Sequence, residues 1–437
     1  MTHLTHFLPM FSGLALYTLY VFAYMNGLIP QISTIIKSGR LPIGPNTDPA
    51  NMIGKPAEAG GLIGAILNLL PGLQKPVEVI EGTPELFESA TKLLTNVTGI
   101  PVIDKLIAGA LVLLNSVVDG NSPVTSLWGI NHAGAIGAMY MIIWIESMRR
   151  GNRGKMALHF PAIVGMASQV FGYSIVVPLW SLAQLVYSGL SHEPQQDDVR
   201  VYAMATLALP FSMILGYIIP TLAMALPTTF HPAAIQRFAN SSQQRMLLWL
   251  IWPLSVSLFQ ALFSGIPGTY RRFVPKKVAP GVLAMRIRNG LRLVYWSARF
   301  LAAAPHIFWM GMMLVKHLAP GLLNSNVNLD PSPASPFYPV LPWITNKAKS
   351  VGEGTFWALQ WDYYVASFMF WCWCFKQYRI AHNHAGITIG YPGLAPRALG
   401  MMSVGGLVAS GIDLLAERDE LLMDGMEENE RRNGIKW

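Results

Sequence analysis

Three acidic side chains lie inside long apolar stretches of this sequence: Glu146, Asp362 and Asp413. An ionised carboxylate within hydrocarbon is costly, so an acid in such a stretch is a candidate functional group. A carboxylic acid that burial keeps protonated can donate a proton to a substrate. His306 is the best-placed neutral base or hydrogen-bond donor in the apolar stretches. These four residues are the candidate catalytic groups.

Glu146 also has a structural interpretation, because Arg149 and Arg150 follow it by three and four residues. On a helix this spacing favours ion pairs at an interface. Asn131 and His132 begin the same apolar stretch, about 20 Å from Glu146 along a helix axis. We expect them to line the opposite mouth of a site and to contact substrate there.

Asp413 and His306 have structural alternatives as well. Asp413 follows a run of small residues and precedes Glu417 by four positions, so its carboxylate could simply reach water at a helix end. His306 could be a packing histidine with its hydrogen bonds satisfied. The sequence leaves both alternatives open.

Asp362 lies within a segment that is rich in aromatic residues. Five of them are spaced by four, three, four and three positions and so share one helical face; they are Trp357, Trp361, Tyr364, Phe368 and Trp371. An interfacial aromatic belt explains the first two, but the stripe continues to the far end of the segment. Ring faces stabilise a desolvated cation by about 2 kcal/mol or more per good contact. The stripe is therefore a candidate substrate-binding wall.

The composition is that of a polytopic membrane protein. Of 437 residues, 52% are hydrophobic and 12% charged, roughly half the charged share of soluble domains. About twenty apolar residues cross a bilayer, and eight stretches meet that rule: 7–28, 129–148, 157–189, 201–226, 245–268, 293–318, 354–376 and 395–416. We predict an all-α bundle of seven or eight transmembrane helices in the lipid bilayer of the endoplasmic reticulum. The 157–189 run is long for one crossing, and we expect it to be tilted, or broken near Pro178.

Four regions follow along the chain. Residues 1–29 form a first span or retained signal anchor, and residues 30–127 an extramembrane or interfacial insertion. Within it, 101–118 suits an interfacial or packed helix better than a span. Residues 128–416 form the bundle that carries the site, and 417–437 a charged, solvated tail.

Basic residues after the second span give an orientation with the insertion in the lumen. There Asn96, in Asn96-Val97-Thr98, is a glycosylation candidate. The basic loop 269–292 breaks this alternation. Either one span is miscounted or re-entrant, or the loop binds an anionic headgroup or substrate.

Several sequence patterns are missing. Asp197-Asp198 does not extend to an aspartate-rich box, and His382-Asn383-His384 offers too few histidines for a di-iron site. No Walker loop or dinucleotide-binding fingerprint occurs in a segment whose surrounding sequence would support it. The net charge of +8 reflects residues beside apolar spans, which topology explains better than nucleic-acid binding. We expect no metal, no nucleotide, no nucleic acid and no cofactor.

The chain resembles the integral-membrane terpene cyclases of fungal meroterpenoid pathways. The shared features are helices that cross a membrane, an early acid (Glu146), a late acid (Asp362), aromatic walls and the lack of an aspartate-rich metal box. The string Glu-Ser-Met-Arg-Arg-Gly-Asn-Arg at 146–153 is similar to members of the ascofuranone and ascochlorin type. The resemblance implies that an acid, Glu146 or Asp362, opens the terminal epoxide of an apolar, prenylated (farnesyl-type) phenol. Four rings of the stripe would then shield the cation, with isomerase- or lyase-type chemistry and no cofactor; they are Trp361, Tyr364, Phe368 and Trp371.

Two other functions remain open from the residues alone. Proline-interrupted spans with embedded polar groups are also expected of a transporter or lipid-handling protein. In a scaffold subunit of a membrane complex, all three acids would be structural. The sequence shows no mirrored halves and no pair of matching interrupted helices, which argues against the transporter.

Overall fold

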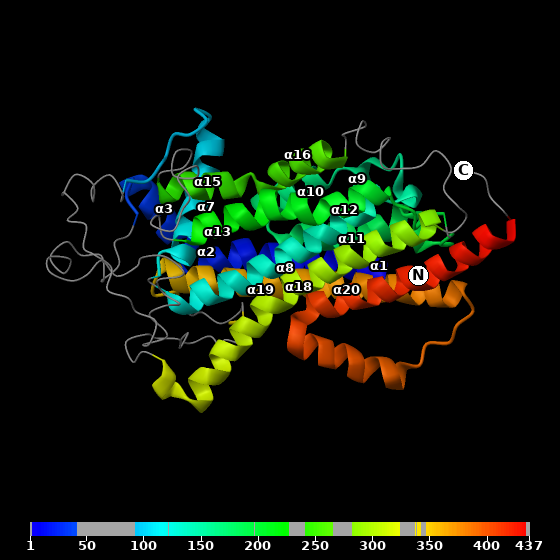
Figure 1. Ribbon diagram of the computed structural model, residues 1–437. Helices are drawn as coiled ribbons and strands as arrows, with labels where there is room; N and C mark the ends of the chain where they lie inside the picture. The colour runs from blue at the N-terminus through cyan, green and yellow to red at the C-terminus, as the bar shows by residue number, and fades with distance from the viewer. Residues whose placement is uncertain are drawn as a thin grey trace.

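The computed structural model describes residues 2–41, 92–120, 122–195, 197–226, 241–264, 282–323, 337, 339–341 and 347–433. This part of the chain contains no strand, only one isolated bridge between Arg40 and Lys92. Its long helices run side by side as an elongated bundle (Figure 1). The predicted all-α fold is thereby confirmed.

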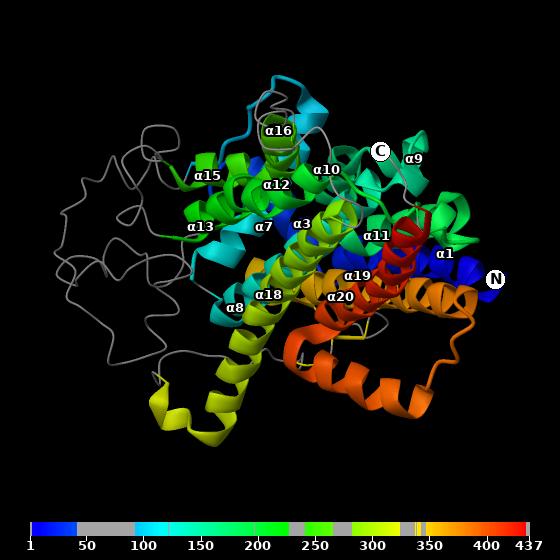
Figure 2. The same ribbon diagram turned by 45° about the vertical axis from the view of Figure 1, so that its right-hand side comes forward.

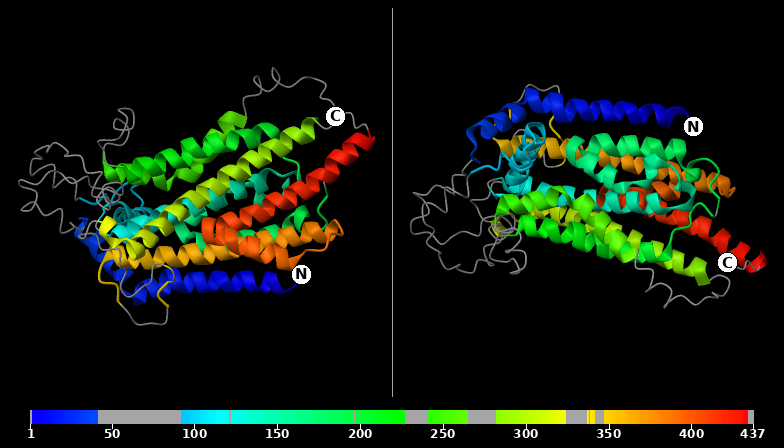
Figure 3. Two further views of the ribbon diagram at one scale, coloured as in Figure 1. Left: turned by 60° about the horizontal axis from the view of Figure 1, so that its bottom comes forward. Right: turned by 90° about the horizontal axis from the view of Figure 1, so that it is seen from above.

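The helices with more than one turn are, in chain order, α1 (Thr2–Leu16), α3 (Leu28–Ser38), α7 (Pro101–Val118), α8 (Pro123–Met148), α10 (Pro161–Phe171), α11 (Tyr173–Tyr187), α12 (Ala203–Met213), α13 (Ile219–Ala225), α15 (Ser242–Leu250), α16 (Trp252–Ser264), α18 (Val282–Leu318), α19 (Val351–His384) and α20 (Tyr391–Asn433). Short helical segments join them: η1 (Tyr17–Phe22), α2 (Ala23–Met25), η3 (Arg150–Asn152), α9 (Met156–His159), η4 (Gly189–Ser191), η5 (Ile214–Ile218) and η7 (Pro320–Leu322). Seen from above, α1 lies along one flank of the bundle and α12 and α18 along the other (Figure 3).

The described residues contain four helices long and apolar enough to cross a membrane: Pro101–Val118, Ala203–Ala225, Ala284–Leu318 and Tyr391–Asp424. Two bent pairs raise this number to six if each is one span: Pro9–Met25 with Leu28–Ser38, and Ser242–Leu250 with Trp252–Ser264. The predicted number of seven or eight spans is not confirmed by the described residues. One difference is α7, the segment that the sequence favours as interfacial but whose length and composition suit a span.

Helices α8 and α19 form the centre of the bundle, and neither is among these candidate spans. Glycines let α8 pack very closely on its neighbours. A Cβ on Gly134 would lie 2.5 Å from the Leu301 carbonyl oxygen of α18, and one on Gly137 would lie 2.5 Å from the Tyr217 ring. Small residues at such crossings allow backbones to approach, so van der Waals packing holds the inner helices in register.

The 157–189 stretch is broken at Gly172 and not at Pro178. Gly172 separates α10 from α11 and has φ +90°, a conformation that residues with a Cβ avoid. Pro178 lies inside α11, where the helix continues past it. The break therefore places a fresh helix N-terminus, with its unbonded N–H groups, in the middle of the bundle.

Helix α20 folds back on itself at Gly406, whose φ and ψ of 75° and 174° are not helical. Arg397 Nε donates to Asp413 Oδ2 at 3.0 Å, although sixteen residues of straight helix would span about 24 Å. Ser410 Oγ likewise donates to the Ala398 carbonyl. The two limbs of this hairpin form a V (Figure 2), so the segment predicted as a crossing at 395–416 reverses direction at Gly406.

The charged tail is not free in solvent over its first part. Helix α20 continues to Asn433, and Arg418 and Asp419 are 1% and 3% exposed. Helix α18 begins at Val282, so the end of the basic loop is helical and pairs with the tail. Arg292 Nε lies 2.6 Å from Glu420. The remaining basic positions of that loop, Arg271, Arg272, Lys276 and Lys277, lie outside the described residues, as does most of the 30–127 insertion.

Candidate active site

Asp362 on α19 meets the helix N-terminus created by the Gly172 break. Its Oδ1 accepts hydrogen bonds from both the backbone N–H and the hydroxyl of Ser174, each at 2.8 Å. Its Oδ2 lies 3.1 Å from Nε2 of His132 on α8. A Cβ on Gly172 would approach Oδ1 to 2.9 Å, so only glycine leaves room for this contact. Asp362, His132 and Ser174 thus bring three helices together around one carboxyl group.

Several polar atoms around this pair are buried and have no hydrogen-bond partner among the described residues. They are His132 Nδ1, Asn131 Nδ2 and Tyr173 Oη. His132 is 6% exposed and Asn131 1%. An unsatisfied buried polar group costs about 1–3 kcal/mol, so these atoms are suited to receive a polar group of a ligand or a bound water.

Aromatic rings surround the same place. Trp128 lies one helical turn before His132, and its ring centroid is 5.0 Å from Trp309 and 5.3 Å from Tyr363, both in edge-to-face geometry. Tyr364 lies 5.6 Å from Trp128. Tyr363 is also 6.3 Å from the His132 ring. The acid pair therefore lies beside a cluster of electron-rich rings that can stabilise positive charge.

The tip of the α20 hairpin closes this region on the α18 side. A Cβ on Gly406 would lie 2.9 Å from Tyr363 Oη and 3.2 Å from His306 Nδ1. His306 Nδ1 is in turn 3.3 Å from Asn131 Oδ1. The structure thus brings four of the predicted site residues into one region of the bundle around Tyr363; they are Asn131, His132, His306 and Asp362.

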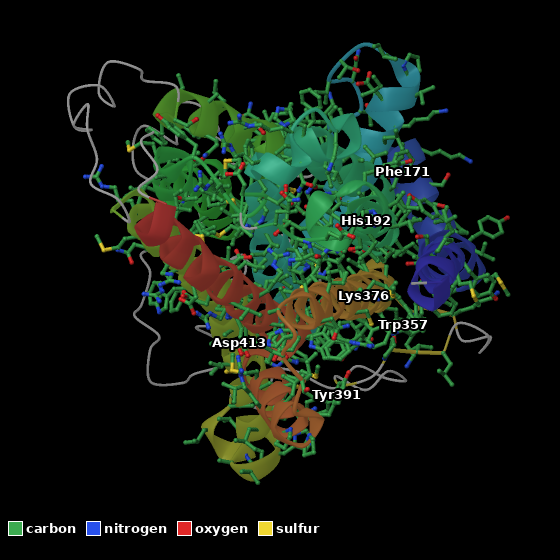
Figure 4. The ribbon with its side chains drawn as sticks, turned by 90° about the vertical axis from the view of Figure 1, so that its right-hand side faces the viewer. Phe171, His192, Trp357, Lys376, Tyr391 and Asp413 are labelled. Atoms are coloured by element: carbon green, nitrogen blue, oxygen red, sulfur yellow. The ribbon has the colours of Figure 1, made fainter. Side chains whose placement is uncertain are left out.

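The predicted aromatic stripe on α19 divides among different neighbours. Trp361 and Tyr364 donate to the carbonyls of Val340 and Phe337, at 2.9 and 2.7 Å. Phe368 is 41% exposed and Trp371 Nε1 donates to Ser410 Oγ. Trp357 stacks on Phe22. Figure 4 shows Trp357 on the side of the bundle where the N-terminal helix lies. Of the five, Tyr364 contacts Trp128 beside the Asp362 site.

Glu146 lies in a different environment, at the other end of α8. Its Oε1 is 2.8 Å from both Arg149 Nε and Arg418 Nη2. Two arginines thus face Glu146, and Asp419 supplies the second negative charge. Asp419 Oδ2 lies 2.6 Å from Arg149 Nη2 and accepts a hydrogen bond from the Tyr295 hydroxyl at 2.6 Å. Burial disfavours a charged Arg149, but the attraction of Asp419 and Glu146 outweighs it and raises the Arg149 pKa above its ordinary value. This buried network ties α8, α18 and α20 together.

Asp413 belongs to a third, more exposed group. It pairs with Arg299 at 2.9 Å and with Arg397 of the other hairpin limb. The group borders a pocket of about 500 Å³ between α18 and α20, which Trp296 and Glu420 also line. In Figure 4, which views the bundle from one end, Asp413 lies on the α20 side, away from Phe171 of α10.

The predicted glycosylation site and the expected lack of a metal site can also be compared with the structure. Asn96 is exposed, and the Thr98 hydroxyl of its sequon donates to Asp104 at 2.8 Å. Among the described residues, no three His, Cys, Asp or Glu side chains gather where they could hold a metal ion.

The sequence did not single out Gly172, Ser174, Trp128 or Tyr363 as site residues. The spacing of Trp128 four residues before His132 was a usable signal, because it places both on one helical face.

Comparison with known proteins identifies a family for this chain. The model of the CtvD domain matches residues 67–423, a range that includes Glu146, Asp362 and Asp413. The chain belongs to the CtvD family. The resemblance to fungal membrane terpene cyclases is thereby confirmed.

Curated relatives of this CtvD-family chain come from fungi and are named terpene cyclases. Terpene cyclase ctvD of Aspergillus terreus is 30% identical over 66% of this chain and 75% of its own length. Terpene cyclase ascI of Acremonium egyptiacum is 25% identical over 78% and 85%, and terpene cyclase atmA of Aspergillus flavus is 25% identical over 76% and 86%. No solved structure matches the chain. These relationships support terpene cyclase activity for this CtvD-family chain.

Proposed function

We propose that this chain is a membrane-embedded, metal-independent cyclase that acts on a farnesyl-type prenylated phenol in fungal meroterpenoid biosynthesis. The reaction begins when the His132–Asp362 pair protonates a terminal epoxide. One observation carries the proposal: the Asp362 carboxyl group is buried, has no arginine or lysine partner among the described residues, and pairs with His132, whose ring lies 6.3 Å from Tyr363. The bundle, in the endoplasmic reticulum, would take its apolar substrate from the bilayer.

The scheme assigns the transferable proton to the pair rather than to one residue, because the imidazole and the carboxyl group lie 3.1 Å apart. Transfer to the epoxide oxygen forms an O–H bond as the C–O bond breaks, and a tertiary cation develops. An alkene of the same chain captures the cation while Trp128, Tyr363 and Tyr364 stabilise it. Loss of one proton from the last cation then yields an isomer of the substrate.

His306 is suited to accept that last proton. It lies in the same region as the pair, in contact with Asn131, and faces the hairpin tip at Gly406. Glu146 and Asp413 have a different role in this proposal. Each carboxylate is paired with arginine side chains, so both acids hold helices in place. No step of the scheme uses a cofactor.

The proposal is tested in microsomes that contain the full chain and an epoxyfarnesyl phenol. We expect a product of unchanged mass but different retention time. Asp362→Asn and His132→Phe should each lower turnover by about 10²–10⁴-fold, the usual contribution of a positioned acid. Asp413→Asn is the matched control and should keep turnover within a few-fold per folded protein. Wild-type turnover in Asp362→Asn would exclude the pair, and a wild-type chain that converts no epoxide would favour transport.

A further inference from the structure

A row of buried polar side chains runs between α11 and α19, starting at Asp362. Here it is called the polar stripe, and its members are Ser174, Ser181, Gln184, Ser188, Ser191 and Gln377. The two helices run in the same direction, because Ser174 contacts Asp362 near one end and Ser191 contacts Gln377 further along. Each member is at most 1% exposed. The stripe therefore leads from the acid toward one end of the bundle.

Most of the stripe lacks hydrogen-bond partners among the described residues. The unpartnered atoms are Ser181 Oγ, both polar atoms of the Gln184 side chain, Ser188 Oγ and Gln377 Oε1. Each such atom would cost about 1–3 kcal/mol if it stayed unsatisfied. Buried waters typically make about three hydrogen bonds to groups of this kind. Five such atoms along one interface are therefore suited to bind bridging waters.

The spacing of the stripe suits single bridging waters. Ser181 and Gln184 are three residues apart on one face of α11, about 4.5 Å along the axis, and Ser188 follows four residues later as the C-cap of the helix. The longer step from Ser174 to Ser181 contains Pro178, which has no N–H and so leaves the Ser174 carbonyl without its helical donor. That carbonyl supplies an acceptor within the gap.

The far end of the stripe reaches the surface. Ser191 is followed by His192, which is exposed at the bundle end that faces the viewer in Figure 4. A Cβ on Gly189 would lie 3.3 Å from the Asp198 carboxylate, so this acidic loop covers the last turn. A histidine and a carboxylate at the mouth can exchange protons with water.

We propose that the polar stripe is a proton-conducting path that returns a proton to the His132–Asp362 pair after each turnover. This inference rests on the proposed function, because it assigns the pair as the acid. One proton enters at His192 and Asp198, passes along hydroxyls and waters to Ser174, and replaces the proton that the epoxide oxygen received. One proton leaves the final cation through His306, so the reaction remains an isomerisation.

The test separates the first turnover from later ones in the full chain in microsomes. With enzyme in excess over an epoxyfarnesyl phenol, Gln184→Leu and Ser181→Ala should react at the wild-type rate, because a first turnover needs no returned proton. With substrate in excess, their steady-state rate should fall about tenfold or more. Their thermal unfolding midpoint should stay the same or rise, since an unpaired polar group is removed.

Ser212→Ala is the matched control. Ser212 is equally buried, but its hydroxyl bonds to Ala208 and Gln260 between α12 and α16, away from the stripe. Both of its rates should be unchanged. An unchanged steady-state rate in Gln184→Leu, or an equal loss in both regimes, would overturn the proton path. Either result leaves the proposed function intact, whereas Asp362→Asn with a normal first turnover would refute the proposed function itself.

Discussion

Asp362 and Glu146 are both buried acids on inner helices, yet their partners differ in charge. Glu146 is held by two guanidinium groups. Asp362 is held by a backbone N–H, a hydroxyl and an imidazole. A fixed positive charge favours the ionised carboxylate, whereas an imidazole can itself give or take a proton. The comparison teaches that burial alone does not identify a proton donor; the charge of the partners decides it.

The largest expected effect that tests this difference between the two acids is a loss of folding stability on substitution of Glu146. Glu146→Gln leaves Arg149 and Arg418 facing only Asp419, so one buried positive charge is uncompensated. Breaking a buried pair in this way costs about 3–5 kcal/mol. We expect a much lower thermal unfolding midpoint in detergent, with turnover per folded molecule retained.

The double variant Glu146→Gln/Arg418→Gln is the control for that change. It removes one charge of each sign and should recover part of the lost stability. A Glu146→Gln protein that is as stable as wild type but inactive would reverse the roles assigned to the two acids.

The next effect concerns the rings beside Asp362. Trp128→Leu removes a ring that contacts Trp309, Tyr363 and Tyr364. Loss of a contact worth about 2 kcal/mol to a developing cation lowers the rate by about thirtyfold. Phe368→Leu, at a half-exposed position of the α19 stripe, is the matched variant and should change the rate by less than about threefold. Product analysis with the epoxide substrate measures both, and equal losses would show that Phe368 of the α19 stripe contributes to the wall as much as Trp128 does.

The smallest effect tests the positioning of the Asp362 carboxyl group. Gly172→Ala adds a Cβ 2.9 Å from Asp362 Oδ1 and 2.6 Å from Leu19, at a backbone φ of +90°. The carboxyl group must shift away from Ser174, and we expect about a tenfold loss of turnover with a smaller loss of stability. Gly154→Ala also replaces a glycine at positive φ, but nothing lies within 4 Å of its Cβ. Equal activity losses in both variants would point to backbone strain alone and not to the carboxyl contact.

A good part of the fold and of the site follows from local sequence. Apolar length predicts helices, and the scarcity of acids within them is enough to single out Glu146, Asp362 and Asp413. The spacing of Glu146 and Arg149 predicts their ion pair, which the structure contains. Composition cannot count the spans, because α8 and α19 carry polar site residues and α20 reverses at Gly406.

What the sequence by itself determined is therefore a bundle of apolar helices, compatible with a membrane, that contains very few acids, since transfer of charge and of backbone into lipid is costly for any chain. Only the tertiary structure decided which acid meets which partner. Arg418 lies 272 residues from Glu146, and Ser174 lies 188 residues from Asp362. Those contacts depend on close crossings at Gly134 and Gly137 and on turns at Gly172 and Gly406, which packing selects and local periodicity does not encode.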